Sequence, residues 1–155
     1  MADHLRTQIR DAVATLVTGL TTTGARVTKG RPESRPLQAA SDLPGLLVYT
    51  NETETDEDGL SGQIGSRRIA QVCSLVVDGY AAGTGEVYET LDTIEKEVRA
   101  ALEAAPTLSA KAKDLQFIGA EREGSDQAEQ PTWRTRMTFR VEFHTREGAP
   151  DAALA

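Results

Sequence analysis

The pattern that most constrains this fold is a strict alternation of apolar and polar residues from Thr132 to Arg146. Successive side chains of a β-strand point to opposite faces, so the alternation predicts one long strand with a buried side and a solvated side. A strand of this kind is typical of an antiparallel sheet that covers a core with one face. The apolar positions are Trp133, Met137, Phe139, Val141 and Phe143, and the polar ones include Arg134, Arg136, Arg140, Glu142, His144 and Arg146.

Two helices are predicted by apolar residues at three- and four-residue spacing. The first covers residues 5–20, with Asp3 as its N-cap. The second covers residues 87–105 and ends before Pro106, because the residue before a proline is disfavoured in helical geometry. Further strands are predicted near residues 25–28, 46–49, 67–80 and 115–121. The expected fold class is α+β: a mainly antiparallel sheet of four to five strands with two main helices packed on one face. We expect a single domain over residues 1–147 and a flexible tail over 148–155.

Length and composition fit one small, acidic globular domain. The chain has 155 residues, 39% of them hydrophobic, with a formal net charge of −7. This apolar content excludes a disordered chain, and the acidic total argues against broad nucleic-acid binding. Charges among the first twenty residues argue against a signal peptide, and no apolar run is long enough to span a bilayer. We therefore expect a soluble intracellular protein without a membrane or a sequence-specific nucleic-acid partner.

The sequence gives little support for catalysis. His4 and His144 are its histidines, and its one cysteine, Cys73, lies within a predicted strand, where cysteine is most often a small buried hydrophobe. The glycines at 79, 83 and 85 match no nucleotide-binding fingerprint. We expect no enzymatic activity, no catalytic residue and no cofactor.

One metal-like spacing is present. Glu54, Asp56, Asp58 and Gly59 follow the first positions of a calcium-binding loop, but Gly65 stands where that loop needs a bidentate carboxylate. The segment is better interpreted as a solvated acidic loop, so no metal site is predicted.

Two charged features are not explained by a plain monomer. Residues 51–59 contain no base and are predicted to form an extended, mobile loop; their acids are Glu52, Glu54, Asp56, Glu57 and Asp58. The polar side of the last strand is rich in arginine. Opposite charges segregated on one small protein suit neighbouring molecules in an assembly, and an ordinary solvated surface is the alternative.

Several short blocks, in order, resemble the tail terminator proteins of long-tailed phages, the lambda minor tail protein U family. The resemblance covers about residues 5–146, and it comes from the order and spacing of the blocks. They are Gly30-Arg31-Pro32, Asp42-Leu43-Pro44, Val48-Tyr49, Leu91-Asp92, Pro106-Thr107-Leu108-Ser109 and Met137-Thr138-Phe139-Arg140-Val141-Glu142-Phe143.

The resemblance implies a non-enzymatic virion protein of the phage tail, assembled in the bacterial host cytoplasm. Members of the family form a homo-hexameric ring that caps the tail tube, stops polymerisation of the tube protein and joins the head-joining or neck protein. On this basis the candidate interface residues are Arg31, Glu52, Glu54, Asp56, Glu57, Asp58, Arg134, Arg136 and Arg140. The alternatives are another small head–tail connector protein and a non-viral ligand-binding module.

Overall fold

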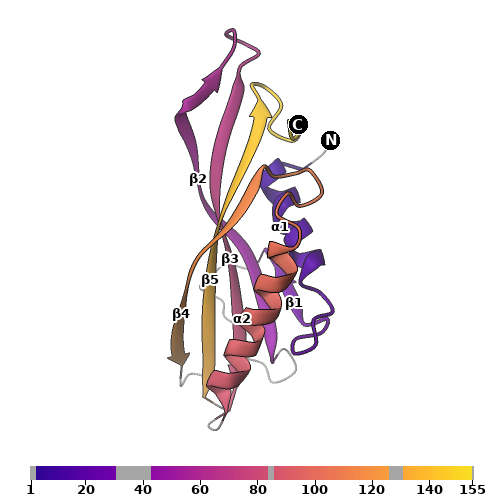
Figure 1. Ribbon diagram of the computed structural model, residues 1–155, viewed down its shortest axis with the longest axis vertical. Helices are drawn as coiled ribbons and strands as arrows, with labels where there is room; N and C mark the ends of the chain where they lie inside the picture. Colours follow the sequence, from indigo (N-terminus) through magenta and orange to yellow (C-terminus); the bar gives the residue numbers. More distant parts are fainter. Residues whose placement is uncertain (1–2, 31–42, 84–85, 126–130, 155) are drawn as a thin grey trace.

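Two helices lie along one side of a long twisted sheet (Figure 1). The structure is a computed structural model that describes residues 3–30, 43–83, 86–125 and 131–154, with side chains left out at 52, 56–59 and 125. The elements in chain order are α1 (Leu5–Leu16), β1 (Val27–Lys29), β2 (Gly45–Ser61), β3 (Arg68–Ala82), α2 (Val87–Glu103), β4 (Asp114–Ser125) and β5 (Thr132–Arg146).

The sheet is mixed. Its strand order is β1-β2-β3-β5-β4, in which β1 runs parallel to β2 and the other neighbours are antiparallel. Isolated bridges join Leu20 to Gly24 and Arg146 to Ala149, which adds paired segments beyond the named strands. The predicted fold class, a mainly antiparallel sheet of four to five strands, is therefore wrong for this sheet. The parallel pairing of the three-residue strand β1 with β2 depends on the path of the chain between them. The pattern of apolar and polar residues within either strand does not predict that path.

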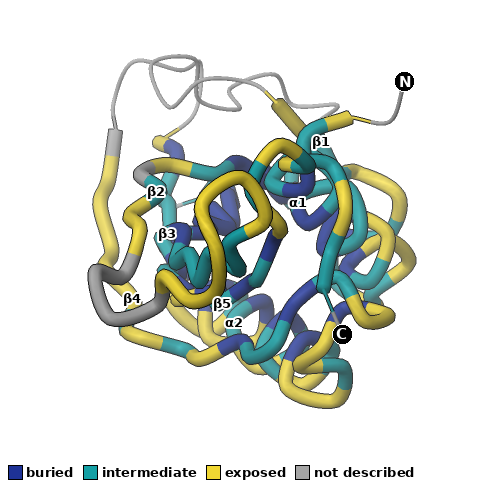
Figure 2. Tube along the Cα trace, turned by 90° about the horizontal axis from the view of Figure 1, so that it is seen from above, coloured by how far each residue is buried: buried dark blue, intermediate teal, exposed yellow. Residues whose placement is uncertain are grey.

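The main core lies between the helices and one face of the sheet. Leu46 and Val48 of β2 belong to it, and viewed along the long axis the buried stretches gather toward the middle of the molecule (Figure 2). The alternation predicted for the last strand is confirmed, because Met137, Phe139, Val141 and Phe143 of β5 are all fully buried in this core. We call the opposite side of the sheet the outer face. There Leu47, Tyr49, Val76 and Tyr80 form a second, smaller apolar cluster.

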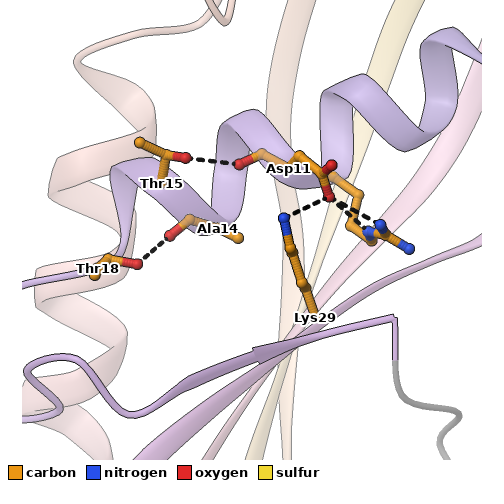
Figure 3. Close-up of polar contacts among 6 residues, drawn as sticks. Asp11, Ala14, Thr15, Thr18 and Lys29 are labelled. Carbon is orange, nitrogen blue, oxygen red and sulfur yellow. Dashed lines mark hydrogen bonds and ion pairs between the residues drawn. The ribbon is translucent and has the colours of Figure 1, made fainter. Parts of the chain in front are cut away.

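Helix α1 is tied to the neighbouring strand β1 by charge. The Nδ1 atom of His4 accepts a hydrogen bond from the backbone N–H of Arg6 at 3.0 Å, so His4, rather than the predicted Asp3, is the N-cap. Lys29 of β1 lies 3.3 Å from a carboxylate oxygen of Asp11, which Arg10 also contacts (Figure 3). Burial raises the pKa of Asp11, but hydrogen bonds and charge from Arg10 and Lys29 outweigh it and leave that pKa below its ordinary value.

The segment 51–59 is not the loop that its charge predicts, because its backbone belongs to strand β2. Pairing with β3 continues through Thr53, Glu54 and Thr55 and returns at Leu60. The register shifts between Thr50 and Thr53 and again between Thr55 and Leu60. Acidic residues at these shifts thus occupy irregular places in a strand.

We call residues 51–67 the arm, meaning the distal part of β2 and the turn that leads to β3. The arm lies at the end of the sheet beyond the helices (Figure 1). Its turn is anchored by residues at the end of β5: Glu147 accepts hydrogen bonds from the backbone N–H groups of Gly65 and Arg67 at 2.7 and 3.3 Å. Arg146 also donates to the carbonyl of Ser66 at 3.0 Å. These contacts, between residues about 80 positions apart in the chain, hold the turn in a defined position.

The connection after α2 and the end of the chain are both ordered by hydrogen bonds. Leu108, Ser109 and Ala110 all have positive φ, so the chain after α2 forms a left-handed turn that places Leu108 in the core. Residues 148–154 fold back beside α1. There the backbone N–H of Leu5 donates to Pro150, and that of Leu154 donates to His144.

Candidate interaction surface

Two of the predicted interface arginines are already paired within the outer face. Register places Arg136 of β5 opposite Asp78 of β3, and Arg134 opposite Tyr80. Arg136 donates from Nε to Asp78 at 3.0 Å, and the hydroxyl of Tyr49 donates to the other carboxylate oxygen at 3.1 Å. Asp78 is completely buried, so this pair is an internal structural contact.

Arg134 makes a similar internal contact further along the strand. It is ion-paired with Glu123 of β4, and its side chain is only 18% exposed. Nearby, burial raises the pKa of Tyr80 to about 12, with a further contribution from the charge of Asp78. Neither Arg134 nor Arg136 is therefore a free cation for a partner.

Arg140 differs from these two arginines. It is exposed and has no hydrogen-bond or ion-pair partner within the part of the chain that the structure describes. Register places it opposite Ser74 of β3 and Gln116 of β4. Ile118, in the bulge of β4 beside this position, is 60% exposed. We call Arg140, Ser74, Gln116, Ile118 and Thr138 the open patch, because this part of the outer face is more exposed than the part around Asp78.

The remaining predicted interface residues lie on the arm or outside the described residues. Glu54 is exposed and has no partner among the described residues. The side chains of Glu52, Asp56, Glu57 and Asp58 are not described, although their backbone is in β2. Arg31 lies outside the described residues.

The arm also exposes apolar side chains that sequence reasoning missed. Ile64 in the anchored turn is 85% exposed, and Leu60 just before the turn is 44% exposed. The sequence contains a signal for this exposed side chain, because turns favour Gly, Asn, Asp and Ser and an isoleucine in one is unusual. Scattered exposed apolar residues are ordinary, so these two mark the arm only as a candidate contact surface.

The titratable groups offer no assembled catalytic centre among the described residues. Burial raises the pKa of the Cys73 thiol to about 11, and the positive charge of Arg6 opposes this increase only in part. The thiol is therefore protonated at neutral pH and is a poor nucleophile. His144 accepts from Arg68 at 3.0 Å and contacts Glu142 at 3.0 Å, and both contacts belong to the surface of the sheet.

Metal and small-ligand sites are the other possibilities for a functional site. Over the described ranges, no group of three or more His, Cys, Asp or Glu side chains is arranged to hold a metal ion. Glu54 and its acidic neighbours lie on a strand, not in the helix-flanked loop that calcium-binding spacing requires. A groove of about 320 Å³ runs along α2, and its lining is Asp92, Glu95, Lys96, Arg99, Ala100 and Glu103. None of the helices in the described part of the chain has the length and apolarity needed to cross a membrane.

The chain has a distant likeness to a solved structure. No protein-family model matches the chain, and no curated protein matches it. The chain is similar to one described under "Virion of native gene transfer agent (GTA) particle", with 18% sequence identity and a TM-score of 0.38. The match covers 94% of this chain and 92% of the other. A likeness at this level assigns neither family nor function, so the tail-terminator resemblance stays a prediction.

Proposed function

We propose that this chain is a structural protein of a phage-like particle, which caps the tail tube as a ring, ends tube polymerisation and offers a surface to the head-joining protein. The geometric observation that carries the proposal is the anchored arm, which projects Ile64 at 85% exposure from the end of the sheet. The ordered sequence blocks over residues 5–146 point to the same class of protein.

A role in assembly fits how the chemistry is distributed. The exposed charges and apolar side chains singled out above lie on the arm and the open patch, and they do not converge on the groove along α2. Proteins that act by docking present separate surfaces of this kind, with polar groups that set orientation and a few apolar residues that supply binding energy. We therefore propose a non-enzymatic function.

A ring places a specific demand on the subunit. Each copy must present two different surfaces that fit one another head to tail, because only a heterologous contact can repeat around a rotation axis and close. We propose that the ring is a hexamer, as the sequence resemblance implies.

The direct test is a tube-length assay. Purified tail-tube protein of the same particle would be polymerised with and without this protein, and tube lengths would be measured by electron microscopy. We expect added protein to arrest growth at substoichiometric amounts and to appear as density at one tube end. Tubes of unchanged length, with the protein bound instead to the portal side of the neck, would replace this proposal by the connector alternative.

A control separates capping from unspecific interference. Protein carrying Ile64→Asp, at the exposed position of the anchored turn, keeps the same core and is expected to fold normally. Circular dichroism and thermal unfolding would verify this. If the folded variant and the wild type shortened tubes equally, the arm would have no part in capping.

A further inference from the structure

We propose that His144 is a pH-responsive clip between β3 and β5: its neutral ring holds the side chain of Arg68 in place, and protonation of the ring releases that side chain. The inference does not depend on the proposed function. The clip lies on the outer face of the sheet, where the chain returns from the arm, because Arg68 is the first residue of β3.

The two ring nitrogens of His144 have partners of opposite kinds. Nδ1 lies 3.0 Å from Nε of Arg68, and Nε2 lies 3.0 Å from a carboxylate oxygen of Glu142. A guanidinium group can only donate hydrogen bonds, and an ionised carboxylate can only accept them. Nδ1 must therefore carry no proton, and the one proton of the ring must be on Nε2. The two partners thus select a neutral ring in a single tautomer.

A second proton on the ring would change the two contacts in opposite directions. On Nδ1 it would point at the N–H group of Arg68, so this hydrogen bond would be lost and two positive groups would lie 3.0 Å apart. The contact with Glu142 would become an ion pair and would be strengthened. The ring therefore stays beside Glu142, and Arg68 is the group that moves away.

Arg68 has nothing else to hold its side chain. His144 is its one side-chain partner within the part of the chain that the structure describes. Register places Arg146 opposite Arg68, and a second guanidinium offers no acceptor. Once released, Arg68 is a cation without a partner beside the arm. The clip, which holds one arginine and one glutamate, gains one positive charge from the protonated ring.

His144 is the group of this region that responds to pH near neutrality. Its side chain is 16% exposed, so protons can reach the ring from solvent. Carboxyl, lysine and arginine side chains ordinarily keep their charge between about pH 5 and 8, whereas histidine titrates there. The charged residues on the elements around the ring are Arg68 of β3, Glu142 and Arg146 of β5, Asp114 of β4, Glu54 of β2, and Arg67, Lys113, Glu147 and Asp151 of the adjoining segments.

The experiment follows the Arg68 side chain by NMR as the pH changes. Carbon-13 relaxation of its Cδ methylene group would be measured between about pH 8 and about pH 5, the range in which histidine titrates. We expect a rigid group at the upper end and an order parameter below about 0.6, as in flexible groups, at the lower end. The transition should coincide with the titration of the His144 ring in the same sample. Arg136, whose Nε donates to buried Asp78 at 3.0 Å, should stay rigid throughout.

Two variants separate His144 from other effects of pH. In His144→Gln the amide oxygen can accept from Arg68 and the amide nitrogen can donate to Glu142, but the group does not titrate. Arg68 should then be rigid at both ends of the range. His4→Asn is the matched control, because it removes the other histidine and keeps a capping residue on α1. This variant should respond to pH as wild type does, and circular dichroism would verify that both variants fold.

Each result supports or overturns the clip. A pH response of Arg68 that is lost in His144→Gln and kept in His4→Asn supports it. An Arg68 side chain that is equally rigid or equally mobile at both ends of the range overturns it, and so does a response that persists in His144→Gln. If His144→Gln does not fold, Glu142→Gln gives the decision. It removes the ion pair that favours the protonated ring, so the release of Arg68 should require a lower pH, and an unchanged transition overturns the clip.

Discussion

The packing of α2 on the sheet depends on Gly79, and replacing it by alanine should destabilise the protein measurably. A Cβ atom at this position would lie 2.7 Å from Cγ2 of Ile94 on α2 and 3.2 Å from Cγ2 of Thr135 on β5. Ordinary contact begins at 3.4 Å, so Ile94 would have to move by about 0.7 Å. Because Ile94 is fully buried, the movement must come from an unfavourable rotamer or a shift of the helix.

The expected size of the effect follows from two opposing terms. Overpacking a core typically costs about 1–3 kcal/mol. Replacing glycine by alanine recovers about 0.4–1 kcal/mol by restricting the unfolded chain. With mid-range values for both terms the net loss is about 1.3 kcal/mol, which for a chain of this size lowers Tm by roughly 3–5 °C.

Urea unfolding and calorimetry would measure the change against a matched control. Gly119 in β4 has nothing within 4 Å of an added Cβ and has no positive φ, so Gly119→Ala should be neutral or slightly stabilising. In an Ile94→Ala background the clash is removed, and Gly79→Ala should then cost far less than it does in wild type. The reasoning fails if Gly79→Ala matches Gly119→Ala, or if its cost is unchanged by Ile94→Ala.

Three further predictions concern other parts of the fold. Asp78→Ala strands the mostly buried Arg136 and should cost about 3 kcal/mol or more in urea unfolding, whereas Glu123→Ala, which removes a largely exposed partner, should cost under about 1 kcal/mol. Ser109→Gly, at an exposed position with φ of 56°, should raise stability by about 0.5–1 kcal/mol, and a lower Tm would contradict the left-handed turn. The pKa of the Cys73 thiol is about 11 in the folded protein and about 9 in the unfolded chain. The free energy of unfolding should therefore fall as the pH rises from about 9 to about 11, because the unfolded chain loses this proton first. Cys73→Ala should flatten this part of the profile, and identical slopes in the two proteins across the window would exclude the thiol as its cause.

The elements with strong local periodicity could be predicted from the sequence. The alternation in β5 is confirmed because one face packs on the helices while the other carries charge, and the spacing in α2 reports the same core from the other side. The predicted buried strand near residues 46–49 is also confirmed, since its residues from Leu46 to Tyr49 contribute to the apolar clusters on both faces of the sheet. In each case the burial pattern is set by residues within one segment.

The errors arise where a distant segment decides the outcome. Acidic residues 52–58 have the composition of a solvated loop, yet β3 supplies backbone partners on one side and the arm remains a strand. Likewise, Arg134 and Arg136 read as free charges on a polar face, but β3 and β4 bring Asp78 and Glu123 to them. Asp78 within an otherwise apolar run was the available signal, because a buried carboxylate requires a partner.

The acidic residues of the arm have a physical role at the edge of the sheet. Strand β1 pairs with β2 only over Leu46–Val48, so the outer edge of the arm has no partner strand among the described residues. An unpaired edge invites uncontrolled pairing with other chains, and two features oppose it here: register shifts that interrupt the edge, and like charges that would face one another if two arms met. The register shifts and the acidic residues together therefore protect this edge of the sheet against pairing with the arm of another copy.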